Sequence, residues 1–580
     1  MQYQFGNITI DTKNYRILVN GDITPVKPQV FNLIVYLIEN HHRLVTKDEI
    51  HANIWSGRIV SDTSISTHIK SARKILGDDG KKQKIIKTYH ARGYQFVATF
   101  KETVSDKQEI VNQALKTIVV LPFTNIKSDP QTDYLSFALA SQIINDLAYL
   151  QNFNIVPASM IREFINSKAN PTEIAIELNA ENVVCGNYLI ENDAIRINFE
   201  IIDTQSQKVI SQEQIEDRHS NTFKLQDRVS SNVISAFNGQ SKGKVSNPSR
   251  VRNIPKSALA FEYYLRAISY PYTNEGHHLA IEMLKKSLDL DDSFAPSYPH
   301  LGNHIRLLEQ HGRISSENNQ STEWYYQKAL ELNPELVEAL MNLALYYTET
   351  GKLEEAYFIA RRMFKINPNC AEFHFILGYI FRYAGMVDEA IEEMETALKL
   401  SPDNKRYRSI ISTYIGAGKY QQALEKTYLG DEVYADIFSG QITFMQGKIE
   451  QARKHLENAL KADSHGLSGL VATVYLAVLD NNLLIGKESL EKIVDTKIID
   501  AENMFYFAGF YALLSEQEKC LELLNKAVDC GYYNYIHIQT TPNLNSVKHS
   551  DKYQEILAKA KKGSESFKKT VRANPVQSNS

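Results

Sequence analysis

The side chains best placed to do chemistry in this sequence lie between Ser61 and Leu76. Four apolar residues recur at i, i+4, i+7 and i+11 and would form one buried stripe on a helix: Ile65, Ile69, Ala72 and Leu76. The other face would carry hydroxyl groups and cations: Thr63, Ser66, Thr67, Lys70, Ser71, Arg73 and Lys74. Such groups can hydrogen-bond to base edges and phosphates in the major groove of DNA. A solvated amphipathic helix has the same pattern, so this stretch alone leaves both interpretations open.

Positive charge is concentrated at the start of the chain. The 580 residues have a formal net charge of -4, but residues 1–103 carry 15 Lys or Arg and 9 Asp or Glu, a net charge of +6. The rest of the chain carries 49 basic and 59 acidic side chains. Between Lys70 and Arg92 there are eight basic residues and two acidic ones, Asp78 and Asp79. This local excess is typical of a surface that binds a polyanion.

Cysteine spacing and hydropathy argue against several classes of protein. The four cysteines are far apart and form no Cys-x-x-Cys pair, which argues against a zinc site and a disulfide framework: Cys185, Cys370, Cys520 and Cys530. No stretch approaches the roughly 18 uninterrupted apolar residues of a membrane-spanning helix. The N-terminus lacks the basic and apolar regions of a secretory signal. We therefore expect a soluble, uncleaved, cytoplasmic protein that binds neither a membrane nor a metal ion.

The elements that would position the helix at Ser61–Leu76 follow from the pattern of the first 100 residues. Alternating apolar residues and an Asn20-Gly21 turn predict short antiparallel strands at the start. Thr46 and Glu49 have the spacing of a capping box at the start of a helix. In chain order we predict strands over 3–26, a helix from Pro28, a second helix from Thr46, a loop over Ser56–Val60, the helix at Ser61–Leu76 and a hairpin over 85–97.

Strands, three helices and a hairpin in this order are typical of a winged helix-turn-helix domain, and residues 3–98 resemble the OmpR/PhoB-type DNA-binding domain of bacterial regulators. The resemblance rests on Phe31, Leu44–Ile50 with Trp55, Val60–Asp62, Arg73–Gly77, Ile86–Thr88 and Arg92–Phe96. It implies that the third helix enters the major groove and that the hairpin, or wing, places Arg92 at the adjacent minor groove. A cation beside a glycine at a hairpin tip is free to approach a narrow, electronegative groove.

The resemblance implies further roles in this domain. The predicted DNA contacts are Thr63, Ser66, Thr67, Lys70, Ser71, Arg73, Lys74 and Arg92. The loop Ser56–Val60 lies where some members of the family contact RNA polymerase. His68 could face DNA or help to pack the helix. Trp55 should be in the core. Family members usually follow a phosphorylated receiver domain. Here the DNA-binding domain comes first, so we expect control from the C-terminal side.

Residues 117–238 read as an α/β domain between two linkers. A polar stretch over 101–116 forms the first linker, and a stretch over 239–256 rich in Ser, Asn, Lys, Arg and Pro forms the second. The motifs Val119–Phe123, Gly186–Tyr188, Ile202–Thr204 and Leu225–Asp227 resemble the TolB-N-terminal-like module. Asp129, Asp133 and Asp146 lack the spacing of paired catalytic carboxylates, and no glycine-rich phosphate loop follows a strand. We therefore predict no catalytic residue and no cofactor.

From residue 257 the sequence repeats. Asn333-Pro334, Asn367-Pro368 and Ser401-Pro402 are spaced by 34 residues, as are Gly351–Ala356 and Gly385–Ala390. This period and these residues resemble tetratricopeptide repeats. We predict about eight helical hairpins over 257–561, with an insertion around residues 309–321, and a polar tail over 562–580. Stacked hairpins form a superhelix suited to binding a peptide or another protein.

The predicted fold class is therefore a multidomain, mainly α chain: a winged helix-turn-helix domain over 1–100, a central α/β TolB-N-terminal-like domain and a C-terminal α-solenoid. The whole order resembles the HilA-type virulence-gene activators. This resemblance implies a sequence-specific regulator of promoter DNA, controlled through its central and repeat domains, and not an enzyme. Two alternatives remain open. One is a repeat scaffold whose basic head binds nucleic acid without sequence preference, and the other is a nucleotide-linked enzyme of the central domain.

Overall fold

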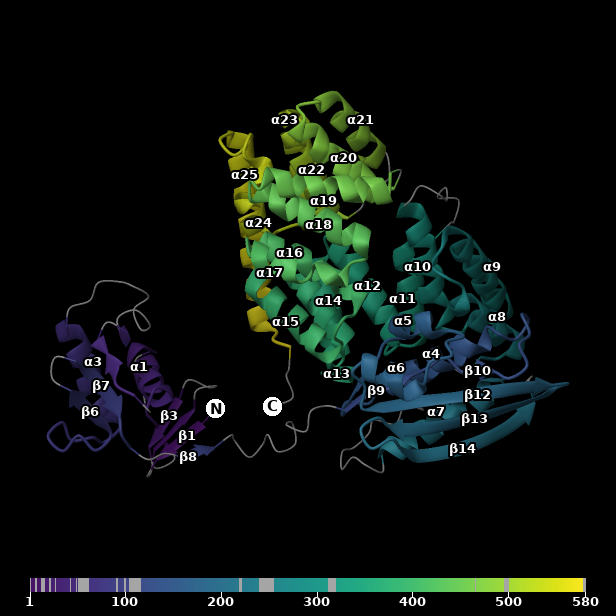
Figure 1. Cartoon of the computed structure of the whole chain (residues 1–580), viewed down its shortest axis with the longest axis horizontal. Coiled ribbons are helices and arrows are strands. Elements are labelled where there is room, and N and C mark those ends of the chain that lie inside the picture. Colours follow the sequence, from purple (N-terminus) through teal and green to yellow (C-terminus); the bar gives the residue numbers. More distant parts are fainter. Residues whose placement is uncertain are drawn as a thin grey trace. The chain divides into compact units, whose positions relative to one another are not determined.

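The computed structural model describes most of the chain as two compact units, Met1–Leu115 and Lys116–Ser580. The described residues are 2–5, 8–11, 16–19, 22–24, 26, 28–41, 43–47, 49–50, 62–89, 92–98, 101–103, 116–218, 222–238, 255–310, 320–464, 466–494 and 500–576. The predicted fold class is confirmed within this part of the chain: an α+β first unit is followed by an α/β sheet and a helical solenoid (Figure 1).

The first unit contains two antiparallel sheets and two described helices. The larger sheet has the order β4-β3-β2-β1-β8, and the smaller has the order β5-β7-β6. The helices are α1 (Pro28–Glu39) and α3 (Asp62–Ile75). The strands are β1 (Gln2–Phe5), β2 (Ile8–Asp11), β3 (Arg16–Val19), β4 (Asp22–Thr24), β5 (Val45–Thr46), β6 (Ile86–Tyr89), β7 (Gly93–Phe96) and β8 (Lys101–Thr103).

The apolar stripe predicted on α3 lies in the core of the first unit. All four of its residues are at most 2% exposed, and they pack in one cluster with α1 and the strands: Ile65, Ile69, Ala72 and Leu76. Burying Ile65, Ile69 and Leu76 contributes roughly 1.5–3 kcal/mol each, so the stripe fixes the rotation of α3 about its axis. The opposite face of α3 must therefore point away from the core.

The first three residues of the predicted linker differ from the prediction. Lys101–Thr103 form β8, which pairs antiparallel with β1 through Gln2, Tyr3 and Gln4. The edge of β1 would otherwise offer unpaired backbone groups, and a strand of any composition can satisfy them. The polar composition of Lys101–Thr103 therefore gave no indication that these residues form a strand.

The second unit begins with a mixed sheet in the order β11-β9-β12-β13-β14, with the short β10 (Thr124–Asn125) paired to β12. The strands of this sheet are β9 (Lys116–Val120), β11 (Phe153–Ile155), β12 (Asn182–Glu191), β13 (Ala194–Asp203) and β14 (Lys208–Arg218). Helices α4 (Leu135–Leu147) and α7 (Thr222–Asn238) pack on each other and contact the sheet. The shorter α5 (Ala158–Ile161) and α6 (Pro171–Glu177) complete the domain.

The α/β domain and the solenoid share one hydrophobic core. Gln142 donates a hydrogen bond to the hydroxyl of Tyr264 at 2.8 Å. The guanidinium of Arg162 donates to the backbone carbonyls of Ile268, Ser269 and Tyr270 at the end of α8 (Ala258–Ser269). A cation at a helix C-terminus satisfies carbonyls that have no partner within the helix. The sheet is thereby fixed to the first helical hairpin.

Antiparallel helical pairs make up the solenoid, as the period of 34 residues predicts. After α8, the paired helices are α9 (Asn274–Leu290), α10 (Ser297–Gln310), α11 (Thr322–Leu332), α12 (Val337–Glu349), α13 (Leu353–Ile366), α14 (Ala371–Tyr383), α15 (Val387–Leu400), α16 (Ile410–Gly416), α17 (Tyr420–Glu425), α18 (Glu432–Met445), α19 (Ile449–Ala462), α20 (Leu467–Leu479), α21 (Leu483–Val494), α22 (Ala501–Leu513) and α23 (Gln517–Asp529). Most of the insertion predicted around residues 309–321 lies outside the described residues. None of the helices in the described part of the chain is both long and apolar enough to cross a membrane.

The C-terminal stretch predicted as a polar tail is instead mostly helical. After α24 (Tyr535–Thr540), α25 (Asp551–Ala573) runs along the side of the solenoid and contacts α13 and α23 (Figure 1). Phe567 is 1% exposed, and its ring lies 5.8 Å from that of Tyr357, whose hydroxyl donates to the carbonyl of Asn574 at 2.7 Å. The prediction failed because the few apolar residues of α25 are separated by runs of Lys and Glu.

Candidate nucleic-acid interface

Helix α3 presents most of the predicted DNA contacts to solvent. Ser66, Thr67, Lys70 and Lys74 are exposed. Ser71 is half-buried, and its hydroxyl donates to the carbonyl of Thr67 at 3.0 Å. Thr63 belongs to α3, but its side chain lies outside the described residues. His68 is half-buried, so its side chain is neither fully packed nor fully exposed.

The Arg73 side chain is bound within the protein, to the wing. Its Nη2 donates to the carbonyl of Ile86 at 2.7 Å and to the hydroxyl of Thr88 at 2.8 Å, and both acceptors belong to β6 of the wing. The Arg73 side chain is only 15% exposed. A guanidinium group presents donors in a fixed fork, so two bonds to one strand hold that strand in a defined position. Arg73 therefore ties the end of α3 to the wing.

Asp78 organises the turn between α3 and the wing, and sequence reasoning missed this role. Its side chain is 0% exposed and lies 3.5 Å from Nε of Arg73. Its carboxylate accepts hydrogen bonds from the backbone N–H groups of Lys84, Ile85 and Ile86 at 2.9, 3.2 and 2.9 Å. A buried carboxylate with four such partners is fully satisfied. The only sequence signal was its place directly after Gly77 at the end of the helix.

The wing holds Arg92 at the solvent-exposed tip between β6 and β7. The backbone N–H of Arg92 donates to the carbonyl of Tyr89 at 3.0 Å and closes the turn. The next residue must be glycine, because Gly93 has a φ of +151° and a Cβ there would lie 2.0 Å from the carbonyl oxygen of Val45. The turn therefore has a rigid base, while the charged side chain at its tip is exposed.

The charge of this region is almost entirely on the surface. Seven of the eight basic residues between positions 70 and 92 are exposed: Lys70, Lys74, Lys81, Lys82, Lys84, Lys87 and Arg92. Of the two acids in the same stretch, Asp78 is the one buried against the eighth basic residue, Arg73. The buried pair cancels, so the exposed side chains of this stretch, seven basic and one acidic, present a net positive charge to solvent and ligands.

The capping box predicted at the start of the second helix is confirmed. The backbone N–H of Glu49 donates to the hydroxyl of Thr46 at 3.2 Å, and the N–H of Thr46 donates to the Glu49 carboxylate at 2.8 Å. The backbone N–H of Thr46, followed by the Arg43 guanidinium and the Thr46 hydroxyl, lowers the pKa of Glu49. Trp55 and the loop Ser56–Val60 lie outside the described residues, so their predicted roles stay predictions.

In the α/β domain, the Asp133 carboxylate is hydrogen-bonded to the loop that precedes it. Asp133 accepts hydrogen bonds from the side chain of Asn125 at 2.7 Å, from the hydroxyl of Ser128 at 3.1 Å and from the N–H of Asp129 at 3.2 Å. Burial, with the nearby Glu200 carboxylate, raises the pKa of Cys185 to about 12, so its thiol is not activated. Within the described residues, no three His, Cys, Asp or Glu side chains are grouped to hold a metal ion.

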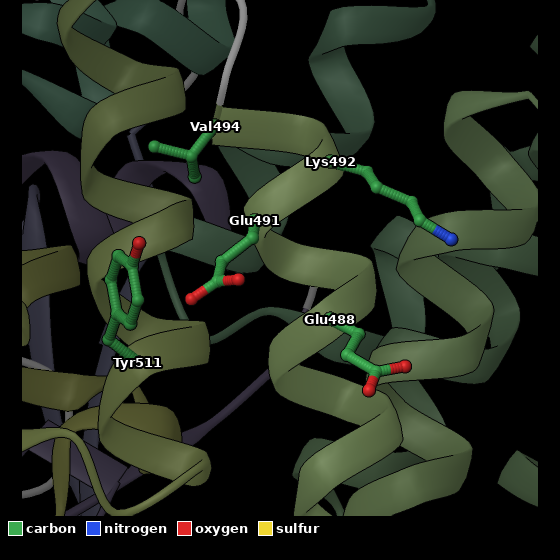
Figure 2. A pocket seen from close by; sticks show the side chains of 5 residues that line it. All are labelled: Glu488, Glu491, Lys492, Val494 and Tyr511. Carbon is green, nitrogen blue, oxygen red and sulfur yellow. The ribbon is translucent and has the colours of Figure 1, made fainter.

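The surface of the solenoid has a groove. It lies between α21 and α22 and is lined by Glu488, Glu491, Lys492, Val494 and Tyr511 (Figure 2). Lys519 lies 4.0 Å from the Glu491 carboxylate and 5.6 Å from the centre of the Tyr511 ring. The charges at this groove are therefore partly neutralised by neighbours, and its side chains do not converge on one point.

Models of three protein families match parts of this chain. The family "transcriptional regulatory protein, C terminal" matches residues 21–96. The family "HilA/YgeH-like transcriptional regulator, second domain" matches residues 114–232. Tetratricopeptide repeats match residues 325–358 and 371–404. The resemblances inferred from the sequence for the first domain and for the repeats are therefore confirmed.

Individual proteins also match parts of this chain. The transcriptional regulator HilA of Salmonella typhi is 21% identical over 466 residues, which cover 77% of this chain and 80% of that protein. The regulatory protein VanRB of Enterococcus faecalis is 30% identical over 95 residues, which cover 16% of this chain and 41% of that protein. Among solved structures, the DNA-binding domain of Klebsiella pneumoniae RstA, in complex with the RstA box, is 24% identical and covers 17% of this chain and 96% of that one, with a TM-score of 0.15.

Proposed function

We propose that this chain, a DNA-binding transcriptional regulator, activates transcription from promoters whose sequence it recognises. The premise is its domain order: an OmpR/PhoB-type DNA-binding domain is followed by a HilA/YgeH-like second domain and tetratricopeptide repeats. The observation that carries the proposal is the exposed face of α3 beside a wing with an exposed Arg92. Hydroxyl groups and cations on a helix of this kind can reach base edges, and the wing cation suits a narrow minor groove.

The predicted contacts divide into three groups in this proposal. Thr63, Ser66 and Thr67, near the start of α3, are proposed to contact base edges with Lys70, and Arg92 is proposed to enter the minor groove. Ser71 and Lys74, nearer the end of α3, are proposed to contact phosphates. Arg73 is proposed to hold the wing in place, because its guanidinium is already bound to β6.

Control is proposed to come from the central domain and the solenoid, which form one compact unit. A protein or peptide that binds the solenoid would be the signal, because helical repeats present extended surfaces for such ligands. RNA polymerase is proposed to contact the loop Ser56–Val60. Action on promoter DNA in a bacterium would place the protein in the cytoplasm. Activation is inferred by analogy with HilA-type regulators, and expression that rises when the gene is deleted would contradict it.

The proposed function predicts that the full chain selects particular sequences from a pool of randomised DNA duplexes. Binding at two salt concentrations, followed by sequencing of the retained duplexes, is the measurement. We expect enrichment of a short motif, because base contacts add to the salt-dependent attraction of the exposed cations. A reporter that carries the enriched motif should then respond to the protein in cells. Retention without enrichment would support a scaffold with a non-specific basic head.

Replacing Lys74 with alanine should weaken binding to all DNA sequences alike and lower the slope of log affinity against log salt by about 1. Lys74 is exposed near the end of α3, where we propose that it contacts a phosphate. Affinity titrations over a range of salt concentrations measure this slope. The control is Lys208→Ala, which removes an exposed lysine from β14 of the second unit and should leave the slope unchanged. A change of preference at one base pair in Lys74→Ala would refute the phosphate assignment.

A further inference from the structure

The C-terminal part of the solenoid packs against the turns of its first half. Two turns between paired helices, at Gly351 and Gly385, come so close to the chain after α23 that no Cβ fits. A Cβ at Gly351 would lie 2.7 Å from the carbonyl oxygen of Cys530, and one at Gly385 would lie 2.6 Å from that of Tyr533. The N–H of Tyr533 donates to the carbonyl of Tyr383 at 2.8 Å. The solenoid therefore closes on itself between residues 179 and 148 positions apart in sequence.

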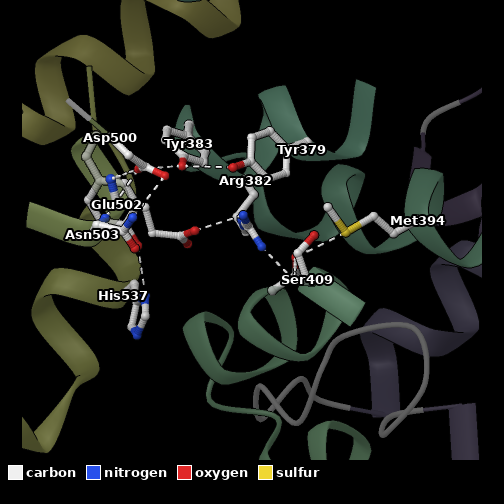
Figure 3. A network of polar contacts seen from close by, with 11 residues as sticks. Tyr379, Arg382, Tyr383, Met394, Ser409, Asp500, Glu502, Asn503 and His537 are labelled. Atoms are coloured by element: carbon white, nitrogen blue, oxygen red, sulfur yellow. Dashed lines mark hydrogen bonds and ion pairs between the residues drawn. The ribbon is translucent and has the colours of Figure 1, made fainter. Parts of the chain in front are cut away.

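A buried polar network lies at this closure, between the end of α14 and the start of α22 (Figure 3). Arg382, which is 1% exposed, donates to the Glu502 carboxylate at 2.8 Å and to the carbonyl of Ser409 at 2.6 Å. The hydroxyl of Tyr383 donates to the Asp500 carboxylate at 2.8 Å. Asp500 also caps α22, because it accepts from the N–H groups of Glu502 and Asn503.

The charges of this network do not balance. Three carboxylates, Glu349, Asp500 and Glu502, face two guanidinium groups, Arg306 and Arg382. Arg306 pairs with Glu349 at 2.7 Å and Arg382 pairs with Glu502 at 2.8 Å, so within the described residues no guanidinium is left for Asp500. One negative charge is therefore in excess in a largely buried cluster, which is costly while the solenoid stays closed.

Within the described residues, the tyrosines and the histidine that face the cluster do not neutralise this charge. Burial raises the pKa of four tyrosines well above the ordinary range, so their hydroxyls stay protonated: Tyr379, Tyr383, Tyr506 and Tyr532. Burial, with repulsion from Arg382, lowers the pKa of His537 on α24 to about 3, so this imidazole is neutral. Among the described groups, the excess charge is therefore removed by protonating a carboxylate or by separating the two halves of the solenoid.

We propose that the cluster of Arg306, Glu349, Arg382, Asp500 and Glu502, here named the Arg382 latch, couples closure of the solenoid to the uptake of a proton by its carboxylates. The closed solenoid is then favoured in mildly acidic solution and loosens in mildly alkaline solution. This inference concerns the second unit alone and does not depend on the DNA-binding function proposed above.

The expected direction of the response to pH follows from the pKa values of the three carboxylates. Burial raises the pKa of Glu349 and of Glu502 to about 7, and burial also raises that of Asp500. In the open solenoid these groups return towards their ordinary values near 4.5 and 3.8. The closed form therefore holds a proton that the open form releases, so closure is most stable below about pH 4.5 and weakens as the pH rises through about 7. The three groups interact and titrate as one system.

Hydrogen exchange of the full chain at about pH 6 and about pH 8 tests this inference. After correction for the intrinsic effect of pH, amides of α22 and α24 should open about tenfold more often at the higher pH, as expected for one group titrating near 7. Amides of α4 in the central domain are the internal reference and should show no change. Equal protection of α22 at both values would overturn the inference without any variant.

The Asp500→Asn variant removes the negative charge of Asp500 but keeps its hydrogen bonds. Asparagine can still cap α22 and accept the hydrogen bond from Tyr383, but it leaves two carboxylates for two guanidinium groups. The variant removes the repulsion by which Asp500 adds to the raised pKa of Glu349 and Glu502, so the tenfold response of α22 to pH should shrink. The matched control is Asp431→Asn, because Asp431 caps α18 in the same way but is exposed, and its variant should keep the response of the parent. An unchanged response in Asp500→Asn would refute the proposal.

Discussion

Replacing Asp78 with alanine should destabilise the DNA-binding unit by about 3–5 kcal/mol, as breaking one side of a buried ion pair does. The carboxylate is 0% exposed, so its loss leaves the Arg73 guanidinium without its charge partner. It also leaves three backbone N–H groups, those of Lys84, Ile85 and Ile86, without an acceptor. A loss of this size is a large part of the roughly 5–15 kcal/mol that stabilises a typical domain.

Urea unfolding of residues 1–115, followed by circular dichroism, measures this loss, because these residues form a compact unit with their own hydrophobic core. The matched control is Asp79→Ala at the neighbouring position. Asp79 is exposed, and the hydrogen bond it accepts from the N–H of Lys81 lies at the surface, so this variant should unfold almost like the parent. Equal unfolding midpoints for the two variants would show that the turn is held by other contacts.

The fate of Arg73 shows what helical periodicity can and cannot predict. The spacing of the apolar stripe fixed which residues of α3 face the core, and burial confirms all four. Arg73 is next to this stripe, so its position in the sequence allowed its side chain either to contact DNA or to bind another part of the protein. The choice is made by Ile86 and Thr88, 13 and 15 residues further along the chain, and no local pattern encodes it. A residue predicted to read DNA is therefore now proposed to position the wing.

In the second unit too, local sequence patterns predict the elements but not the contacts between residues far apart in the sequence. Its strands follow from alternation over a few residues, and its helical pairs follow from a pattern that recurs every 34 residues. Closure of the solenoid depends on pairs such as Arg382 with Glu502 and Tyr357 with Asn574, which are 120 and 217 residues apart. Glu502 lies in the first turn of α22, where an acidic residue is ordinary. Its burial against an arginine is a property of the assembled superhelix.

Replacing Arg382 with methionine should destabilise the second unit by about 3–5 kcal/mol, because it leaves the Glu502 carboxylate buried without a partner. Arg382 and Glu502 are 1% and 7% exposed, so solvent cannot compensate for the loss. Thermal unfolding of the full chain, with exchange of α22 as a local readout, is the measurement. The control is Arg453→Met, since Arg453 makes an ion pair of similar length with Asp480, 2.7 Å, at the surface, and its loss should change little.

The double variant Arg382→Met with Glu502→Met distinguishes two roles for the latch. Removing both charges leaves no unpaired ion, and such replacements are often neutral or stabilising because the cost of desolvating the ions is also removed. Recovery of stability in the double variant would therefore mean that the pair contributes little net stability to the closed solenoid. The pair would then serve to make closure depend on charge, which is the property that the proposed response to pH requires. If the double variant stayed as unstable as Arg382→Met, the loss would come from packing around the arginine stem, and the charge would not be its cause.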